Sequence, residues 1–297
     1  MTGTGIDKVG VIGCGLMGSG IAQAAATAGF RTVVRDVDDA FLQRGQKTIR
    51  SSLDKLVEKG TLDAAKRAGA LDKLVFTTNL ADLTDSDIVI EAVTEDLVIK
   101  NELWTALDKH CPPATIFATN TSSLTIAEMA AATSRADRFV GLHFFNPVPL
   151  MPLVEVVRTV TTSQETFDRA FDFARRLGKE PVAAKDGSGF IVNRLLVPFL
   201  NDAVRAVEQG VASVPDIDQA MRLGCGHPMG PLTLLDFIGL DTAVRIGEIM
   251  FQEYREARFV APPLLRRMVA AGLHGRKNGR GFYDYRSQPP TPTPLGL

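Results

Sequence analysis

Hydrophobic positions follow two periods along the first 185 residues. Short runs rich in β-branched residues, such as KVGVI at 8–12, RTVV at 31–34 and DIVIEAV at 87–93, alternate with longer segments whose apolar residues recur at helical spacing. After Gly189 the pattern is helical only. Because alternating strands and helices form a parallel, doubly wound sheet, the sequence predicts an α/β, Rossmann-like domain followed by an all-α domain.

The change of pattern also predicts the domain boundaries. We expect the sheet-containing domain to cover residues 1–185 and the helical domain to cover residues 186–285. The last residues, 286–297, read RSQPPTPTPLGL, which is rich in proline and has no core pattern. Such a composition is typical of a disordered tail.

Composition and charge exclude several classes of function. The 297 residues are 45% hydrophobic and 23% charged, with a formal net charge of -1, so nothing in the charge balance favours a nucleic-acid or membrane partner. The three cysteines, at 14, 111 and 225, have no paired spacing for a metal or a disulfide framework. We therefore expect a cytoplasmic protein without a metal site.

The first strand leads directly into a dinucleotide-binding fingerprint. Gly13-x-Gly15-x-x-Gly18 follows the strand and precedes an alanine-rich helix, and the next strand ends in Asp36, 18 residues beyond Gly18. The glycines permit a tight turn and close approach to a pyrophosphate, and the acid can bind a ribose hydroxyl. Asp36 favours NAD over NADP, although the adjacent Arg35 leaves NADP open. Leu16 and Met17 complete the loop.

Polar residues follow the ends of several later strands. Glu95, Asn120, Ser122 and His143 all fall at or just after such ends. Ligands of doubly wound sheets bind beyond the carboxyl ends of the strands, so we expect these side chains to share one rim. Serines in turns commonly satisfy only the loop backbone, but the position of Ser122 makes it a candidate substrate contact.

A histidine and a glutamate lie at the two ends of an apolar, proline-rich stretch. Residues 140–158 read VGLHFFNPVPLMPLVEVVR, and the prolines between His143 and Glu155 predict a turn that brings the two side chains together. A carboxylate that accepts from one ring nitrogen makes the other nitrogen a better base. A buried structural pair is the alternative. His227, in GCGHPMGP, is the main competing histidine, whereas His110 and His274 have structural explanations.

Two further polar positions have both structural and functional interpretations. Thr125 followed by Glu128 predicts a capping box at the start of a helix. Asn193 lies on the apolar face of a long helical segment that contains Pro198. A buried asparagine is usually a satisfied core residue, but this one can also reach a cleft between the two domains.

Six motifs in order along the chain together resemble the L-3-hydroxyacyl-CoA dehydrogenase family, which includes bacterial 3-hydroxybutyryl-CoA dehydrogenases. The motifs are GCGLMG, NTSSL, HFFNPVPLMPLVEVV, DGSGFIVNRLL, GHPMGPLTLLDFIGLD and KNGRGFYDY. The resemblance implies NAD-dependent oxidation of the 3-hydroxyl of an acyl-CoA, reversible and on a short chain, and a homodimer formed through the helical domain.

The resemblance also implies roles for individual residues. His143 is the expected catalytic base, Glu155 its orienting partner, and Ser122 and Asn193 the contacts of the reacting oxygen. The expected cofactor contacts beyond the glycine loop and Asp36 are Glu95, Lys100, Ser122, Asn146 and Lys277. For the CoA group the resemblance favours Ser52 and Lys59, which with Lys55 share one face of a predicted helix.

Two other functions remain open at this stage. A relative with the same catalytic parts can act on a free hydroxy acid of the gulonate or carnitine type, and would not need the phosphate contacts of Ser52 and Lys59. A non-catalytic NAD-binding or structural protein can keep the same fold. The presence of both His143 and Glu155 argues against the second alternative.

Overall fold

The chain forms two compact units in a computed structural model that describes residues 5–296. The first unit ends at Phe190 and the second begins at Ile191. The first contains the sheet and the second is largely helical, which confirms the predicted fold class. Within the described residues, no helix combines the length and apolar character needed to cross a membrane.

The described part of the first unit contains one sheet of eight strands in the order β3-β2-β1-β4-β5-β6-β7-β8. The strands are β1 (Lys8–Ile12), β2 (Arg31–Arg35), β3 (Leu74–Thr77), β4 (Ile88–Glu91), β5 (Ile116–Thr119), β6 (Phe139–Phe144), β7 (Leu153–Arg158) and β8 (Glu180–Lys185). Neighbouring strands are parallel except β6 and β7, which are antiparallel. The order reverses at β1, so a ligand crevice is expected beyond the carboxyl ends of β1 and β4.

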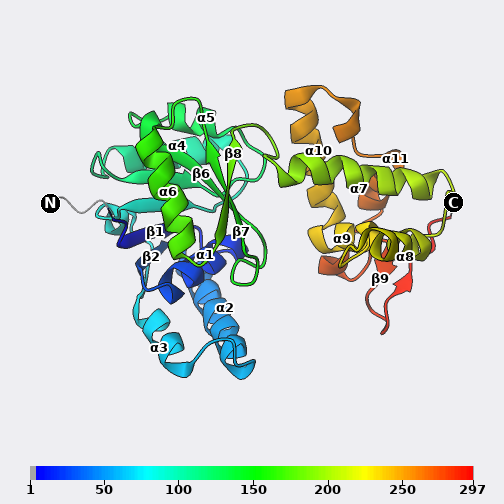
Figure 1. The fold of residues 1–297 in the computed structure, drawn as a ribbon, viewed down its shortest axis with the longest axis horizontal. Helices are drawn as coiled ribbons and strands as arrows, with labels where there is room; N and C mark the ends of the chain where they lie inside the picture. The colour runs from blue at the N-terminus through cyan, green and yellow to red at the C-terminus, as the bar shows by residue number, and fades with distance from the viewer. Residues whose placement is uncertain (1–4, 297) are drawn as a thin grey trace. The chain divides into compact units, whose positions relative to one another are not determined.

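Helices cover both faces of this sheet (Figure 1). They are α1 (Leu16–Thr27), α2 (Asp39–Glu58), α3 (Ala64–Asp72), α4 (Leu97–Asp108), α5 (Ile126–Ala131) and α6 (Gln164–Arg176), with short 3-10 helices η1 (Leu80–Leu83) and η2 (Ala136–Arg138). One hydrophobic core joins the sheet to α1, α2, α3 and α6, and another joins its opposite face to α4 and α5. Successive residues of β4 alternate between them, since Ile88 and Ile90 belong to the first core and Val89 to the second.

The start of α5 differs from the predicted capping box. Thr125 occupies the N-cap position, but its side chain makes no capping hydrogen bond. The carboxylate of Asp186 accepts instead from the backbone N–H groups of Ile126 and Ala127, at 3.1 and 2.8 Å. The carboxylate of a residue distant in sequence therefore replaces the local cap.

The second unit consists of helices around their own core. They are α7 (Val192–Glu208), α8 (Val214–Cys225), α9 (Pro231–Ile238), α10 (Leu240–Tyr254) and α11 (Pro263–Ala270), with 3-10 helices η3 (Ala257–Phe259) and η4 (Arg276–Asn278). Apolar residues from α7, α9 and α11 fill the core, including Leu200, Leu235 and Leu265. Pro198 lies inside α7 without ending it.

The structure differs from the predicted disordered tail. Tyr283–Asp284 (β9) and Thr291–Pro292 (β10) pair as short antiparallel strands, which the helical pattern after Gly189 did not predict. Thr293 N donates to Phe282 O at 2.9 Å, and Leu295 packs against the helical core. The pairing and one apolar anchor order a segment whose composition alone lacks a core pattern.

A buried carboxylate secures this C-terminal segment to α9. Asp236 is fully buried and accepts from the backbone N–H groups of Phe282 and Tyr283, at 2.8 and 2.9 Å, and from the hydroxyl of Tyr285 at 3.1 Å. Burial raises the pKa of Asp236 to about 6, and nearby Asp218 adds to the rise against the opposing hydrogen bonds. The folded protein therefore holds this proton more tightly than the unfolded chain does.

This pKa predicts an unusual dependence of stability on pH. Between pH about 4 and about 6 the folded state binds more protons at Asp236 than the unfolded state, so its contribution to stability falls as pH rises. The free energy of unfolding of the wild type relative to Asp236→Asn should therefore decrease by about 2 kcal/mol across this range. Denaturant unfolding of both full-length proteins, followed by circular dichroism at several pH values, measures the difference. A difference that grows with pH would contradict the assignment.

Candidate active site

Three glycines lie in the loop between β1 and α1. Protein packing leaves no room for a larger residue at Gly13 and Gly18, but it does not explain Gly15. Gly13 has a φ of +94°, and a Cβ there would lie 2.5 Å from the carbonyl oxygen of Ala92. A Cβ on Gly18 would lie 1.8 Å from the oxygen of Gly13. A Cβ on Gly15 would meet no protein atom within 4 Å. Glycine at position 15 is therefore explained by the approach of a ligand to the backbone, which fits a dinucleotide pyrophosphate.

Helix α1 presents its N-terminus to the same loop. No side chain caps its first turn, and no acidic residue lies there to compete with an anion. Leu16 is exposed at the first position, whereas Met17 packs against the core. The free N–H groups and the helix dipole together favour a phosphate at this end.

Asp36 is fixed beside the glycine loop at the end of β2. Its Oδ2 accepts from Cys14 N at 2.6 Å, and its Oδ1 accepts from Val37 N at 2.7 Å. The remaining lone pairs of the carboxylate can accept from ribose hydroxyls. Arg35 donates from Nε to Thr78 O at 3.3 Å, so its side chain is engaged toward the segment after β3. This arrangement suits NAD.

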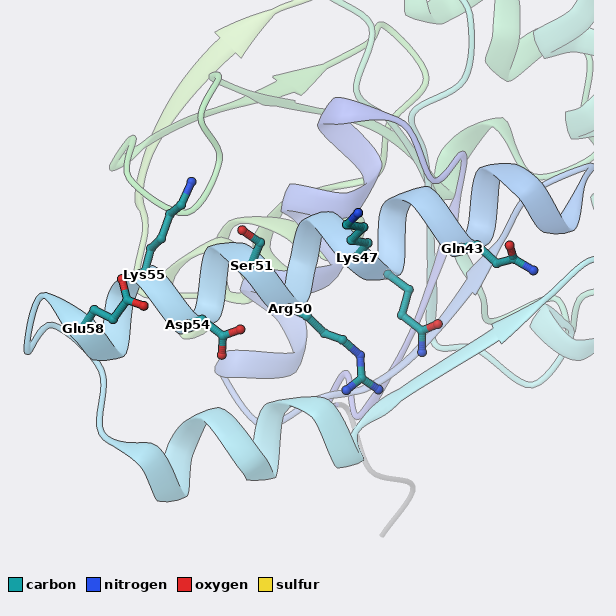
Figure 2. A pocket seen from close by; sticks show the side chains of 8 residues that line it. Gln43, Lys47, Arg50, Ser51, Asp54, Lys55 and Glu58 are labelled. Atoms are coloured by element: carbon teal, nitrogen blue, oxygen red, sulfur yellow. The ribbon is translucent and has the colours of Figure 1, made fainter.

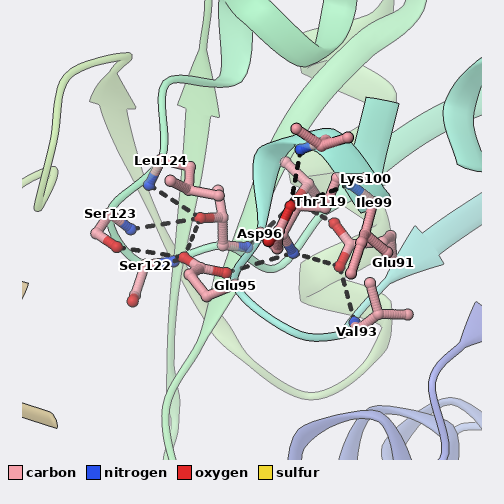
Figure 3. Close-up of polar contacts among 12 residues, drawn as sticks. Glu91, Val93, Glu95, Asp96, Ile99, Lys100, Thr119, Ser122, Ser123 and Leu124 are labelled. Carbon is pink, nitrogen blue, oxygen red and sulfur yellow. Dashed lines mark hydrogen bonds and ion pairs between the residues drawn. The ribbon is translucent and has the colours of Figure 1, made fainter. Parts of the chain in front are cut away.

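Glu95 and Lys100 lie beyond the end of β4, and Glu95 contacts the loop of residues 120–124 that contains Ser122 (Figure 3). Glu95 Oε1 accepts from the hydroxyl of Thr121, from Ser122 N at 3.2 Å and from Ser123 Oγ at 3.3 Å. Lys100 Nζ lies 3.3 Å from Glu95 Oε2. Burial raises the pKa of Glu95, but the Lys100 ammonium and these hydrogen bonds outweigh burial and hold the pKa below its usual value. The carboxylate is therefore ionised.

The predicted histidine and glutamate meet across the β6–β7 hairpin. They are paired in register, and His143 Nδ1 lies 2.6 Å from Glu155 Oε2. Exposed fractions are 6% for His143 and zero for Glu155. A carboxylate that accepts at Nδ1 requires the ring proton on that nitrogen, and this arrangement leaves Nε2 as the ring atom that can take up a proton.

Aromatic rings flank this histidine, and a polar contact of the next residue, Phe144, reaches the loop of residues 120–124. The ring centroids of Phe145 and Phe190 lie 4.5 and 5.5 Å from that of His143. Asn120 Oδ1 accepts from Phe144 N at 2.9 Å, which joins the end of β6 to the loop after β5. Apolar neighbours restrict access of water to the imidazole. The structure thus brings His143 and the serine loop to one edge of the sheet.

Three other predicted residues lie outside these contacts. Asn146 is exposed in the loop of the β6–β7 hairpin. Asn193, partly buried in the first turn of α7, and Lys277, in η4, belong to the second unit. Lys277 Nζ forms an ion pair with Asp241 at 2.5 Å. The roles of all three stay predictions.

The competing histidines have different surroundings. The ring of His227 lies edge-on to Phe199, with centroids 5.6 Å apart. Asp236, the first acid after it in sequence, is engaged with the C-terminal segment. His274 Nδ1 lies 3.9 Å from Asp241 Oδ2 in a partly exposed position. Neither has the short buried carboxylate contact of His143.

The predicted CoA contacts line a groove of about 510 Å³ between α2 and the β6–β7 loop. The groove is lined by Lys47, Thr48, Ser51, Ser52, Lys55, Leu56, Lys59, Thr61, Pro147, Pro149 and Leu150. Figure 2 draws the lining of a neighbouring pocket on α2 and shows Ser51 and Lys55, which also line the groove, directed to one side of the helix and Arg50 and Asp54 to the other. Three lysines beside small hydroxyl side chains make the groove suitable for phosphate groups.

Sequence reasoning missed one buried acid of the site. Glu91 ends β4, is fully buried and contacts Lys100 at 2.5 Å. An acid within the apolar run DIVIEAV is the signal that could have identified it. Among residues 5–296, no group of three or more His, Cys, Asp or Glu side chains is arranged to hold a metal ion.

Similarity to known proteins covers nearly the whole chain. Residues 8–187 match the 3-hydroxyacyl-CoA dehydrogenase, NAD binding domain, and residues 189–285 match the 3-hydroxyacyl-CoA dehydrogenase, C-terminal domain. A probable 3-hydroxybutyryl-CoA dehydrogenase of Deinococcus radiodurans is 50% identical over 278 residues, which is 94% of this chain and 100% of that protein.

Two crystal structures share the fold along nearly the full length. FadB2 of Mycobacterium tuberculosis has a TM-score of 0.93 and 48% identity, covering 95% of this chain and 99% of that one. The (S)-3-hydroxybutyryl-CoA dehydrogenase PaaH1 of Ralstonia eutropha has a TM-score of 0.91 and 46% identity, covering 94% and 99%. With an NAD-binding first unit and both family domains in order, the chain belongs to the 3-hydroxyacyl-CoA dehydrogenase family of oxidoreductases.

Proposed function

We propose that this oxidoreductase interconverts short-chain L-3-hydroxyacyl-CoA and 3-ketoacyl-CoA with NAD. The relatives named 3-hydroxybutyryl-CoA dehydrogenase support the short acyl chain. The β6–β7 hairpin carries the proposal, because it provides both the His143–Glu155 pair and one wall of the lysine-lined groove. A free hydroxy acid would need the pair but not the groove.

The proposed proton transfer uses His143 as the base. Its Nε2 takes the proton of the substrate hydroxyl, while the Glu155 carboxylate at Nδ1 stabilises the imidazolium that forms. The glycine loop and Asp36 would hold NAD, which would supply the acceptor for the hydride that leaves the carbon bearing this hydroxyl. Ser122 and Asn193 are the proposed contacts of the reacting oxygen. In the reverse direction the imidazolium returns the proton to the developing alkoxide.

The first test compares a thioester with the corresponding free acid. We expect rapid oxidation of NADH with acetoacetyl-CoA, followed at 340 nm, and at least about 100-fold lower kcat/KM with acetoacetate, because the free acid lacks the phosphate contacts. Equal turnover of the two substrates would reject the acyl-CoA assignment.

Charge reversal at a groove lysine tests the proposed phosphate contacts directly. Lys59→Glu should raise KM for acetoacetyl-CoA about 10-fold with kcat nearly unchanged, since the contact contributes equally to substrate and transition state. Lys109→Glu, at the C-terminal end of α4, reverses a lysine outside the groove and should leave KM unchanged.

Replacement of the proposed base should lower turnover without loss of cofactor. His143→Gln is expected to reduce kcat by about 10²- to 10⁴-fold, because it removes general acid–base catalysis. NADH affinity, measured by fluorescence titration, should remain within about 3-fold of the wild type, which is only a small change in binding free energy. His227→Gln is the matched control and should retain normal kcat. Normal kcat in His143→Gln together with a large loss of kcat in His227→Gln would identify His227 as the base.

Cofactor preference tests the position of Asp36. We expect kcat/KM with NADH to exceed that with NADPH by about 100-fold, since a 2′-phosphate would lie against the carboxylate. Asp36→Asn should reduce this preference by about 10-fold or more through loss of the charge. Steady-state rates with both cofactors at saturating acetoacetyl-CoA measure the ratio, and a wild type that prefers NADPH would contradict the proposal.

A further inference from the structure

Glu91 is a buried acid whose two carboxylate oxygens both accept hydrogen bonds. Its Oε1 accepts from Val93 N at 2.8 Å and from Lys100 Nζ at 2.5 Å, and its Oε2 accepts from Thr119 Oγ1 at 2.7 Å. The exposed fraction of Glu91 is zero and that of Lys100 is 1%. Burying such a pair costs desolvation free energy that hydrophobic packing would avoid, so its presence calls for a function.

Lys100 connects Glu91 to the serine loop. Its ammonium lies between two carboxylates, 2.5 Å from Glu91 and 3.3 Å from Glu95. Glu95 in turn accepts hydrogen bonds from Thr121, Ser122 and Ser123, as Figure 3 shows. The series of contacts therefore runs from the end of β4 to the loop after β5.

The backbone of Glu91 supports the same loop from its other end. Asn120 N donates to Glu91 O at 2.8 Å, and Thr121 N donates to Thr119 Oγ1 at 3.2 Å. Asn120 also accepts from Phe144 N through its side chain. One residue thus contacts the loop directly through its backbone and indirectly through its carboxylate.

The position of Glu91 in the sheet places these contacts under the crevice. Glu91 pairs with Ile12, directly before the glycine loop, and with Thr119 on its other side. Asp36, the proposed ribose contact, lies at the end of β2 on the opposite side of β1. A dinucleotide that crosses the switch point from β2 therefore extends its second half over β4 and β5.

We propose that Glu91 is a positioning residue for the nicotinamide half of the cofactor pocket. Its carboxylate fixes the ammonium of Lys100, and Lys100 fixes Glu95 together with the loop around Ser122. Glu91 acts only through these neighbours and need not touch the ligand. The inference rests on the proposed function in one respect, the use of this pocket for the reacting half of NAD.

The decisive variant is Glu91→Gln, which keeps the size of the side chain and removes its charge. NADH affinity, measured by fluorescence titration without substrate, should weaken about 10-fold or more, because Lys100 loses one of its two anchors. The groove on α2 is not altered, so any rise in KM for acetoacetyl-CoA should be smaller than the loss of NADH affinity. Because NADH binding requires no turnover, a failure of the substrate assignment would not affect this result.

Asp108→Asn provides the matched control. Asp108 ends α4, and its carboxylate contacts Arg135 Nε at 2.6 Å with side-chain exposures of 13% and 7%. The substitution breaks another largely buried ion pair of the same unit, away from the loop of Ser122. It should lower the melting temperature of the full chain but leave NADH affinity unchanged. Equal weakening by both variants would show only a general loss of stability and would overturn the proposal.

A double-mutant cycle tests whether Glu91 acts through Lys100. Glu91→Gln added to Lys100→Met should cause less than a 2-fold further loss of NADH affinity, because the connection is already broken. The same loss in both backgrounds would overturn the proposed route. If Glu91→Gln alone does not fold, the double variant, which removes both charges, provides the comparison with Lys100→Met.

Hydrogen exchange of the ligand-free protein gives an independent measure of positioning. Faster exchange at the amides of Ser122, Ser123 and Leu124 in Glu91→Gln, but not in Asp108→Asn, is expected because Glu95 and Thr121 hold these groups. Unchanged exchange at this loop would overturn the inference, whatever the substrate of the enzyme.

Discussion

The requirement that a buried charge find a partner governs the carboxyl edge of the sheet. His143, Glu155, Glu91 and Lys100 are all buried or nearly so, and each would be costly to leave unpaired. Their contacts at 2.5 and 2.6 Å meet that requirement in two separate pairs. The pairs also fix the orientation of groups that face the ligand crevice. The contacts that make burial of these polar groups tolerable therefore also make the site rigid.

Strand register decides whether these partners meet. Along β6 and β7 a shift of one residue would exchange the faces of every side chain, and His143 would no longer oppose Glu155. The apolar neighbours Leu142 and Val156, buried against the helices on one face, oppose such a shift. The hydrophobic cores on the two faces therefore maintain the geometry of a polar pair between them.

Much of this arrangement was predictable because its signals are local. The glycine spacing, the acid directly after β2, and the turn-forming prolines between His143 and Glu155 lie within short segments whose strand pattern is clear. The cap of α5 was not predictable, since Asp186 lies about 60 residues from the helix it caps, and only the folded sheet brings it there. The order of the C-terminal segment likewise depends on Asp236 in a distant helix.

Glu91 shows why a candidate site read from sequence is incomplete. Glu95 can be identified as a candidate from the sequence because it follows a strand in a polar stretch. Glu91 is the one acid at the end of an apolar strand, and the sequence alone gives it no partner. Its meaning depends on Lys100, which reaches back from α4 to the strand end. A residue that contacts a ligand typically lies in a loop, where a polar residue after a strand can be recognised from the sequence. A residue that positions such a contact lies in the core beneath it, and it becomes visible only when its charge is seen to have a buried partner.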